Sequence, residues 1–258
     1  LRREAVRKFV LTRLRTVCGG VYFQKGNFFM LFDDKKIEFV LLEKLKGVDT
    51  KGWIFFAAAA VLAAALIIFL VQRRKKCTEP AAFTGNPTPT VILVHGALCI
   101  AISFVLSYFK LFSMPNGGSI TLASMLPLMV YSNRYGAKYG VMAGVVYGFL
   151  QYIQNPEMTH WIQMLVDYPI AFGVIGLGGL VKGERNLVFS VLIGGTLRFL
   201  CHLFTGAVFF GEYAAAGQSA FMYSLLYNAP YMFADIAVCV IIAMLPPFRK
   251  AIRSALKY

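Results

Sequence analysis

The run WIFFAAAAVLAAALIIFLVQRRKK, residues 53–76, decides the class of this protein. Its first nineteen residues, Trp53–Val71, carry no charge, and a basic cluster follows them directly. A bilayer core needs roughly 20 consecutive apolar residues in a helix, so this run predicts a transmembrane helix. The basic cluster after it is typical of a cytosolic helix end.

The composition of the whole chain agrees with a membrane protein. Of its 258 residues, 58% are hydrophobic and 15% are charged, and the mean hydropathy is +0.64. A soluble domain of this composition has too few polar side chains to cover its surface. The net charge of +14 sits in short clusters between apolar runs, which favours cytosolic loops, so we expect a lipid bilayer and no nucleic acid as partner. The five cysteines show no CxxC spacing, so neither a disulfide framework nor a metal site is expected.

Six further apolar segments follow a basic and polar linker at 73–90. They are Val91–Phe112, Thr121–Tyr131, Tyr139–Ile153, Pro169–Val181, Leu187–Phe210 and Tyr223–Leu245. We therefore expect an all-α integral membrane protein with a six-helix bundle over 91–248. One extra hydrophobic helix over 53–72 precedes the bundle, and a basic tail over 249–258 follows it. Runs rich in small residues, such as GVMAGVVYG and GVIGLGGL, suit close helix packing in lipid.

The basic residues of the loops predict the orientation of the bundle. They occur before the first segment and after the second, fourth and sixth, whereas the loops at 113–121, 154–166 and 206–221 contain none. By the positive-inside rule, both ends of the bundle are cytosolic and these three loops face outward. We expect a multi-pass protein of the cell membrane with a cytosolic C-terminus.

In a soluble protein the PNGGS of the first loop would be a turn between strands. Here we expect an interhelical loop, whose Gly117 and Gly118 make it adaptable over a pocket or simply tight.

The first 52 residues fit this topology less well. They hold twelve Lys or Arg and six Asp or Glu, yet an odd leading helix would place them outside. Three interpretations stay open: the translocated segment does not follow the rule, Trp53–Val71 does not span the membrane, or the start of the chain is not native. RREAVRKFVLTRLR is also compatible with an interfacial basic helix. No function is assigned to residues 1–52.

Polar side chains within the last two segments are candidates for function, because such groups are costly in a bilayer. The residues that share one helical face are Arg198, His202, Thr205 and Phe209 on the fifth segment and Ser224, Asn228, Tyr231 and Asp235 on the sixth. Since the two segments run antiparallel, Arg198 and Asp235 both fall near mid-depth. We expect them to form a buried, structural ion pair that holds the two helices in register.

Polar and aromatic residues also gather near the outer ends of the fourth to sixth segments. They are Asp167, Tyr168, His202, Phe210, Tyr223 and Asn228. Taken alone, Asp167 is more simply an N-cap close to Pro169, and a lone histidine in a helix is more often a packing residue. Together, a carboxylate and an aromatic wall suit a small, flat, cationic ligand. The sequence contains no catalytic or ATPase motif, so we expect neither an enzyme, nor a cofactor, nor transport powered by its own ATP hydrolysis.

Five motifs in order resemble the thiamine-specific substrate-binding (S) subunit of energy-coupling factor (ECF) transporters. They are MPNGGSITL, RYGAKYGVMAGVVYGFLQ, DYPIAFGVIGLGGL, RFLCHLFTGAVFFGEYA and YSLLYNAPY, within about Val91 to Leu245. The resemblance implies a six-helix subunit that binds thiamine from outside with high affinity. It also implies two kinds of partner, a transmembrane coupling protein and two ABC ATPases that use the ATP.

The resemblance further implies roles for particular residues. The implied ligand-binding residues are Asp167, Tyr168, His202, Gly206, Phe210, Tyr223 and Asn228. Asp167 would face the thiazolium cation with a shorter reach than the more familiar Glu, while Tyr223 and Asn228 would hydrogen-bond the aminopyrimidine. Ala97 and Ala101 on the first segment would dock the coupling protein, although packing inside the bundle explains two small residues at this spacing equally well.

Three other functions stay open. An S subunit for another vitamin or for a thiamine precursor would have the same architecture, but the acid at Asp167 favours a cation. A stand-alone secondary transporter usually has more helices and internal repeats, and no convincing repeat occurs here. A membrane-embedded enzyme would use Asp167 and His202, and ligand binding without turnover would exclude it.

Overall fold

The computed structural model describes residues 41–76, 87–114 and 118–256. The chain divides into two units, Leu1–Glu43 and Lys44–Tyr258, and the second contains every element from α3 onward. The interfacial helix proposed for RREAVRKFVLTRLR, most of the predicted linker and Gly117 lie outside the described residues.

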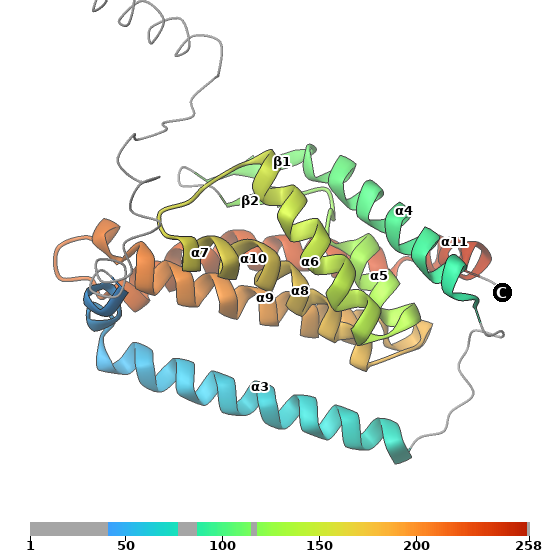
Figure 1. The fold of residues 1–258 in the computed structure, drawn as a ribbon, viewed down its shortest axis with the longest axis horizontal. Helices are drawn as coiled ribbons and strands as arrows, with labels where there is room; N and C mark the ends of the chain where they lie inside the picture. The colour runs from blue at the N-terminus through green and yellow to red at the C-terminus, as the bar shows by residue number, and fades with distance from the viewer. Residues whose placement is uncertain (1–40, 77–86, 115–117, 257–258) are drawn as a thin grey trace, which may run out of the picture. The chain divides into compact units, whose positions relative to one another are not determined.

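Six helical segments follow one another in the order that the sequence predicts (Figure 1). They are α4 (Pro89–Ser107); α5 (Leu126–Tyr135); α6 (Ala137–Gln154); a continuous run of α7 (Trp161–Leu165), η2 (Val166–Ile170), α8 (Ala171–Ile175) and η3 (Gly176–Leu180); α9 (Leu187–Phe209); and α10 (Ala220–Met244). The extra helix, α3 (Thr50–Lys76), precedes them, as predicted. Helices α9 and α10 pack side by side along much of their length. The predicted helical class is confirmed.

Five helices among the described residues are long and apolar enough to cross a membrane. They are Thr50–Phe69, Pro89–Ser107, Trp161–Leu180, Glu184–Phe209 and Ala220–Met244. The predicted spans at 121–131 and 139–153 correspond to α5 and α6, which do not meet that criterion. Helix α5 has ten residues, nine of them buried, because α4, α6, η3 and α9 surround it. Contact with protein on all sides removes the need for a purely apolar surface.

The first of the loops predicted to face outward is part of a β-hairpin, which corrects two predictions. Helix α4 ends at Ser107, and β1 (Lys110–Ser113) pairs antiparallel with β2 (Ser119–Thr121). The prediction of a helix up to Phe112 and that of an interhelical loop at 113–121 were therefore wrong. A short apolar run fits a strand as well as the end of a helix. Because β1 and β2 pair with each other, backbone N–H and C=O groups that have no partner within a helix are hydrogen-bonded here.

The sequence predicted that the fourth segment begins at Pro169. In the structure it begins at Trp161. His160 is its N-cap, and the Nδ1 atom of this residue accepts a hydrogen bond from the N–H of Ile162 at 3.2 Å. Pro169 lies inside the helix, in the π-helical turn η2. Proline has no N–H and crowds the preceding turn, and a wider π turn relieves both problems. Asp167 lies in the same π turn, so its simpler interpretation as an N-cap was wrong.

Glycines let α6 approach the fourth segment at backbone contact. A Cβ added at Gly144 would lie 2.2 Å from the carbonyl oxygen of Phe172, and one at Gly148 would lie 2.5 Å from that of Tyr168. The motif GVMAGVVYG thus packs as small residues in membrane helices are expected to pack. This contact fixes the position of η2, and with it Asp167 and Tyr168.

The N-terminal end of α3 packs against the C-terminal end of α9 and the start of α10. The ring of Phe56 lies 5.4 Å from that of Phe204 and 5.7 Å from that of Phe221, centroid to centroid, both edge-on. Lys44 donates a hydrogen bond from Nζ to the carbonyl oxygen of Phe209 at 3.2 Å. Residues 44–56 therefore lie at the end of the bundle where the predicted outward loops gather.

The predicted basic tail is largely a short helix, α11 (Pro246–Ala255). Arg253 donates from Nε and Nη2 to the carboxylate of Glu184 at 2.8 and 2.9 Å. Glu184 begins the short 3-10 turn η4 (Glu184–Asn186) after the fourth segment. The tail and this loop, both predicted to be cytosolic, are therefore in contact.

Candidate functional site

A cavity opens between the hairpin and the ends of α6, the fourth segment, α9 and α10. All seven residues predicted to bind a ligand line it: Asp167, Tyr168, His202, Gly206, Phe210, Tyr223 and Asn228. Arg198 and Asp235 line it as well. The structure thus brings together side chains from three helical segments that the sequence could only place at the same side of the membrane. That these residues bind a ligand stays a prediction.

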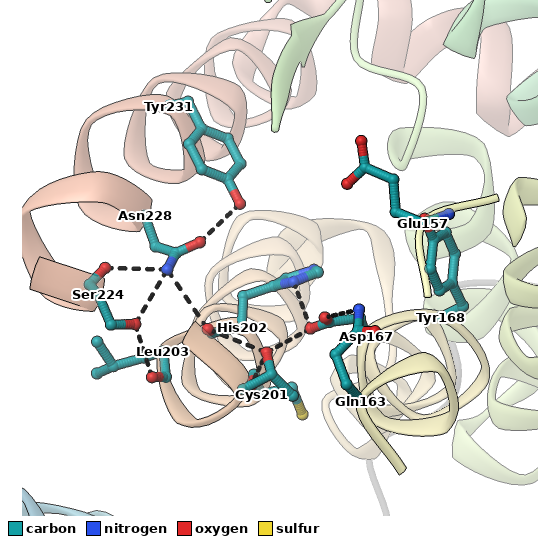
Figure 2. Close-up of polar contacts among 11 residues, drawn as sticks. Glu157, Gln163, Asp167, Tyr168, Cys201, His202, Leu203, Ser224, Asn228 and Tyr231 are labelled. Atoms are coloured by element: carbon teal, nitrogen blue, oxygen red, sulfur yellow. Dashed lines mark hydrogen bonds and ion pairs between the residues drawn. The ribbon is translucent and has the colours of Figure 1, made fainter. Parts of the chain in front are cut away.

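Asp167 and His202 are in direct contact at the wall of this cavity (Figure 2). The Nδ1 atom of His202 lies 2.9 Å from Oδ1 of Asp167, and Thr205 donates its hydroxyl to the same oxygen. Gln163 donates from Nε2 to Oδ2 at 2.7 Å. Because a carboxylate only accepts hydrogen bonds, Nδ1 of His202 carries a proton. The Nε2 atom of the same ring is buried and has no hydrogen-bond partner among the described residues.

The amide of Asn228 has a defined orientation. Its Nδ2 donates to the carbonyl oxygen of Ser224 at 2.9 Å and to the Ser224 hydroxyl at 3.1 Å. The Tyr231 hydroxyl donates to Oδ1 at 2.8 Å, as Figure 2 shows. A carbonyl-type oxygen has two lone pairs. One of them therefore remains for an N–H donor of a ligand in the cavity.

Gly206 is required by helix packing as well as by its place at the cavity wall. A Cβ at this position would lie 2.2 Å from Oγ of Ser224 and 2.9 Å from Nδ2 of Asn228. Any side chain would push α9 away from α10 and displace Asn228. The glycine in RFLCHLFTG thus sets the width of the site.

Tyrosines and a phenylalanine form the aromatic part of the wall. Tyr168 donates its hydroxyl to the carbonyl oxygen of Asn155 at 2.7 Å, which fixes its ring. Tyr223 and Tyr227 stack with ring centroids 6.1 Å apart. With Phe210 they give a cavity wall that combines aromatic rings with the oriented carboxylate of Asp167. This combination suits a flat cation. No group of three or more His, Cys, Asp or Glu side chains that could hold a metal ion occurs in the described part of the chain.

The predicted ion pair has the expected geometry, with one addition. Nη1 of Arg198 lies 3.9 Å from Oδ2 of Asp235, and their side chains are 14% and 4% exposed. The guanidinium also lies over the ring of Phe172, 4.4 Å from its centroid. Both charged side chains reach the cavity wall. The structural role of the pair in the register of α9 and α10 stays a prediction.

The chain has recognisable relatives. Residues 93–254 match a protein family described as thiamine transporter protein. The chain belongs to the thiamine transporter family. It is 36% identical over 169 residues to the thiamine transporter ThiT of Bacillus subtilis, and 26% identical over 178 residues to ThiT of Lacticaseibacillus paracasei. Each alignment covers 60% of this chain and 86% of the relative.

A solved structure of ThiT from Listeria monocytogenes matches with a TM-score of 0.57 at 24% identity. The match covers 66% of this chain and 98% of that one, and at this identity it shows the fold alone. Helix α3 and the residues before it lie outside the thiamine transporter family match.

Several residues that line the cavity were not predicted from the sequence. They are Lys110, Glu157, Gln163 and Tyr227. Gln163 lies four residues before Asp167 on one helical face, so the correct start of the fourth segment would have revealed it. Glu157 follows α6 in a loop without periodicity, which offers no signal. Partial desolvation there raises the pKa of its carboxyl above the ordinary value, and the nearby charge of Asp167 adds to the effect.

Ala97 and Ala101, predicted to dock a partner, both lie on the exposed face of α4. The neighbouring apolar side chains on this face are Leu93, Val94, Leu98 and Val105, each at least half exposed. Gly96, by contrast, faces inward, and a Cβ there would lie 2.9 Å from the Tyr131 hydroxyl. The geometry therefore disfavours internal packing as the reason for the two alanines, and docking stays a prediction.

Replacing Asp235 with asparagine should lower the free energy of unfolding by about 3 kcal/mol, because Arg198 then lacks its opposite charge in a buried position. Thermal unfolding of the detergent-solubilised chain measures the effect, and the order of affinities for different ligands should not change. Glu212→Gln removes a carboxylate that is 60% exposed, and serves as the matched control with unchanged stability. If Asp235→Asn loses only ligand affinity and no stability, the ion pair does not have the proposed structural role.

Proposed function

We propose that this chain captures thiamine at the outer face of the cell membrane, as the S component of an ECF-type ABC transporter. The observation that carries the proposal is the oriented carboxylate of Asp167, which lies beside His202 in an aromatic cavity of a thiamine transporter family member. The names of the two relatives support thiamine as the substrate.

The charge of the cavity suits the thiazolium ring. Its carboxylates are Glu157, Asp167 and Asp235, and its cationic side chains are Lys110 and Arg198. Carboxylates outnumber permanent cations, so a single positive charge on the ligand is favoured electrostatically. Both oxygens of Asp167 accept hydrogen bonds from protein, which holds the carboxylate in place before the ligand arrives. A preorganised charge of this kind costs little reorganisation on binding.

The aminopyrimidine ring would occupy the side of the cavity formed by α9 and α10. Oδ1 of Asn228 can accept a hydrogen bond from the exocyclic amino group. Tyr223 provides a ring face nearby, in line with its predicted role. The tyrosine and asparagine positions are those that the resemblance to thiamine-specific subunits implied.

A comparison of thiamine with a neutral analogue tests this proposal. In the analogue, an uncharged thiophene replaces the thiazolium ring. Quenching of intrinsic aromatic fluorescence should show about hundredfold weaker binding of the analogue, because the contact with Asp167 loses its charge. Riboflavin and biotin are the controls and should not bind. Equal affinity for both compounds would contradict a cation site and favour an S component for another vitamin.

Uptake would require partners. The exposed face around Ala97 and Ala101 supports docking of a transmembrane coupling protein, and two ABC ATPases would hydrolyse ATP on behalf of the complex, so this chain needs no cofactor. The basic residues of α11 support a cytosolic C-terminus. Binding without turnover would distinguish this function from that of an enzyme. Uptake by the chain alone would instead favour a secondary transporter.

A further inference from the structure

Two residues one turn apart on α10 contact strand β2 of the hairpin. At the start of the strand, Gly118 lies on the ring of Tyr231, so close that a Cβ would come within 2.6 Å of Cζ. At its end, Thr121 contacts Asp235. These contacts join the hairpin to the helix that also carries Asn228.

The bonds between Thr121 and Asp235 have ordinary hydrogen-bond lengths and are buried. Thr121 donates its backbone N–H and its hydroxyl to Oδ1 of Asp235, at 2.9 and 3.0 Å. The two residues are 7% and 3% exposed. Arg198, in contrast, lies 3.9 Å from the other carboxylate oxygen. The closest partner of this carboxylate is therefore the hairpin. Without the carboxylate of Asp235, the buried N–H of Thr121 would have no acceptor.

The same contact organises the turn from β2 into α5. The Thr121 hydroxyl gives its proton to Asp235, so its oxygen is free to accept from the N–H of Ser124 at 3.3 Å and from the Ser124 hydroxyl at 2.8 Å. Between them, Ala123 has a φ of 53°, in the left-handed region that is unfavourable for a residue with a side chain. The bonds around Thr121 thus stabilise a strained turn at the cavity wall.

We propose that Asp235 is a positioning residue for ligand capture, which acts through Thr121 to hold the hairpin against α10. Gly118, Ser119, Thr121 and Ser124 line the cavity, so a loosened hairpin would open one of its walls. The identity of the ligand as thiamine rests on the proposed function, whereas the anchoring of the hairpin by Asp235 does not. An ion pair with Arg198 alone leaves the two bonds from Thr121 unexplained.

Replacing Thr121 with valine tests the anchor, because valine has nearly the same shape but lacks the hydroxyl. Hydrogen–deuterium exchange is measured by mass spectrometry on the whole chain in detergent without ligand. We expect the amides of β1 and β2 to exchange about fivefold to tenfold faster in Thr121→Val, because the variant loses the hydroxyl bond to Asp235 and the two bonds that this hydroxyl accepts from Ser124. Thr121→Ser keeps the hydroxyl and should restore protection. Thiamine should dissociate about tenfold faster from the valine variant, with little change in association.

Asp235→Asn separates the anchor from the ion pair. Asparagine keeps an acceptor oxygen for Thr121 but loses the charge opposite Arg198, so hairpin exchange should stay near that of the wild type although the chain is less stable. Unchanged hairpin exchange in Thr121→Val would overturn the proposal. Fast hairpin exchange in Asp235→Asn together with normal exchange in Thr121→Val would also overturn the proposal. It would show that the ion pair with Arg198, and not the bond to Thr121, holds the hairpin. If the hairpin loosens as expected in Thr121→Val but the wild type binds no thiamine, the anchor stands and the proposed function fails.

Discussion

Replacing Asp167 with asparagine should weaken thiamine binding about a hundredfold, equivalent to ~2.8 kcal/mol. Asparagine has the same shape and still offers an oxygen to His202 or Thr205, but it removes the negative charge opposite the thiazolium ring. Charge-assisted contacts in a partly buried site are about twice as strong as neutral ones. Titration of the purified chain with thiamine, followed by intrinsic fluorescence, measures the change.

Two variants control this experiment. Asp167→Glu keeps the charge and has the residue more familiar in thiamine-specific subunits, so it should bind within about threefold of the wild type. Glu212→Gln removes an exposed carboxylate that does not line the cavity and should bind normally. Wild-type affinity in Asp167→Asn would show that the carboxylate does not contact the cation.

Replacing Ala97 or Ala101 with tryptophan should abolish thiamine uptake and leave binding intact. Both alanines lie on the exposed side of α4, turned about 100° and 140° around the helix axis from the inward-facing Gly96. A large ring at either position would prevent the close approach of a partner helix. Uptake of labelled thiamine is measured in cells that also express the coupling protein and both ATPases, and binding is measured on the purified variants.

Ile102→Trp is the matched control for this pair. It adds bulk to the same helix at a half-exposed position that is turned away from Ala101 by about 100° around the helix axis. Uptake should persist in this variant. If the alanine variants lose binding together with uptake, the two small residues serve the packing of the subunit itself.

The features that follow helical periodicity could be predicted from the sequence. Apolar runs of membrane length indicated the order of the helices. Residue spacing indicated that Arg198 and His202 share one face of their helix, and it placed Asn228 on the polar face of the next helix. This works because a helix repeats every 3.6 residues whatever surrounds it. The structure places all three at one cavity.

The features that depend on contacts distant in sequence could not be predicted. Nothing local indicates that Thr121 reaches Asp235, 114 residues away. The hairpin was missed because a short apolar run fits either a helix end or a strand. Pro169 misplaced the start of the fourth segment, because a proline usually stands in the first helical turn and here lies inside a π turn. That error also concealed Gln163, the second partner of the Asp167 carboxylate.

The most direct measurement is equilibrium binding of thiamine to the purified, full-length chain in detergent, by titration calorimetry without any partner subunit. We predict saturable binding of one thiamine per chain, with no heat of binding for riboflavin or biotin. A well-folded chain, judged by a cooperative thermal transition, that shows no saturable thiamine binding would contradict the assignment of the Asp167–His202 cavity as a thiamine site.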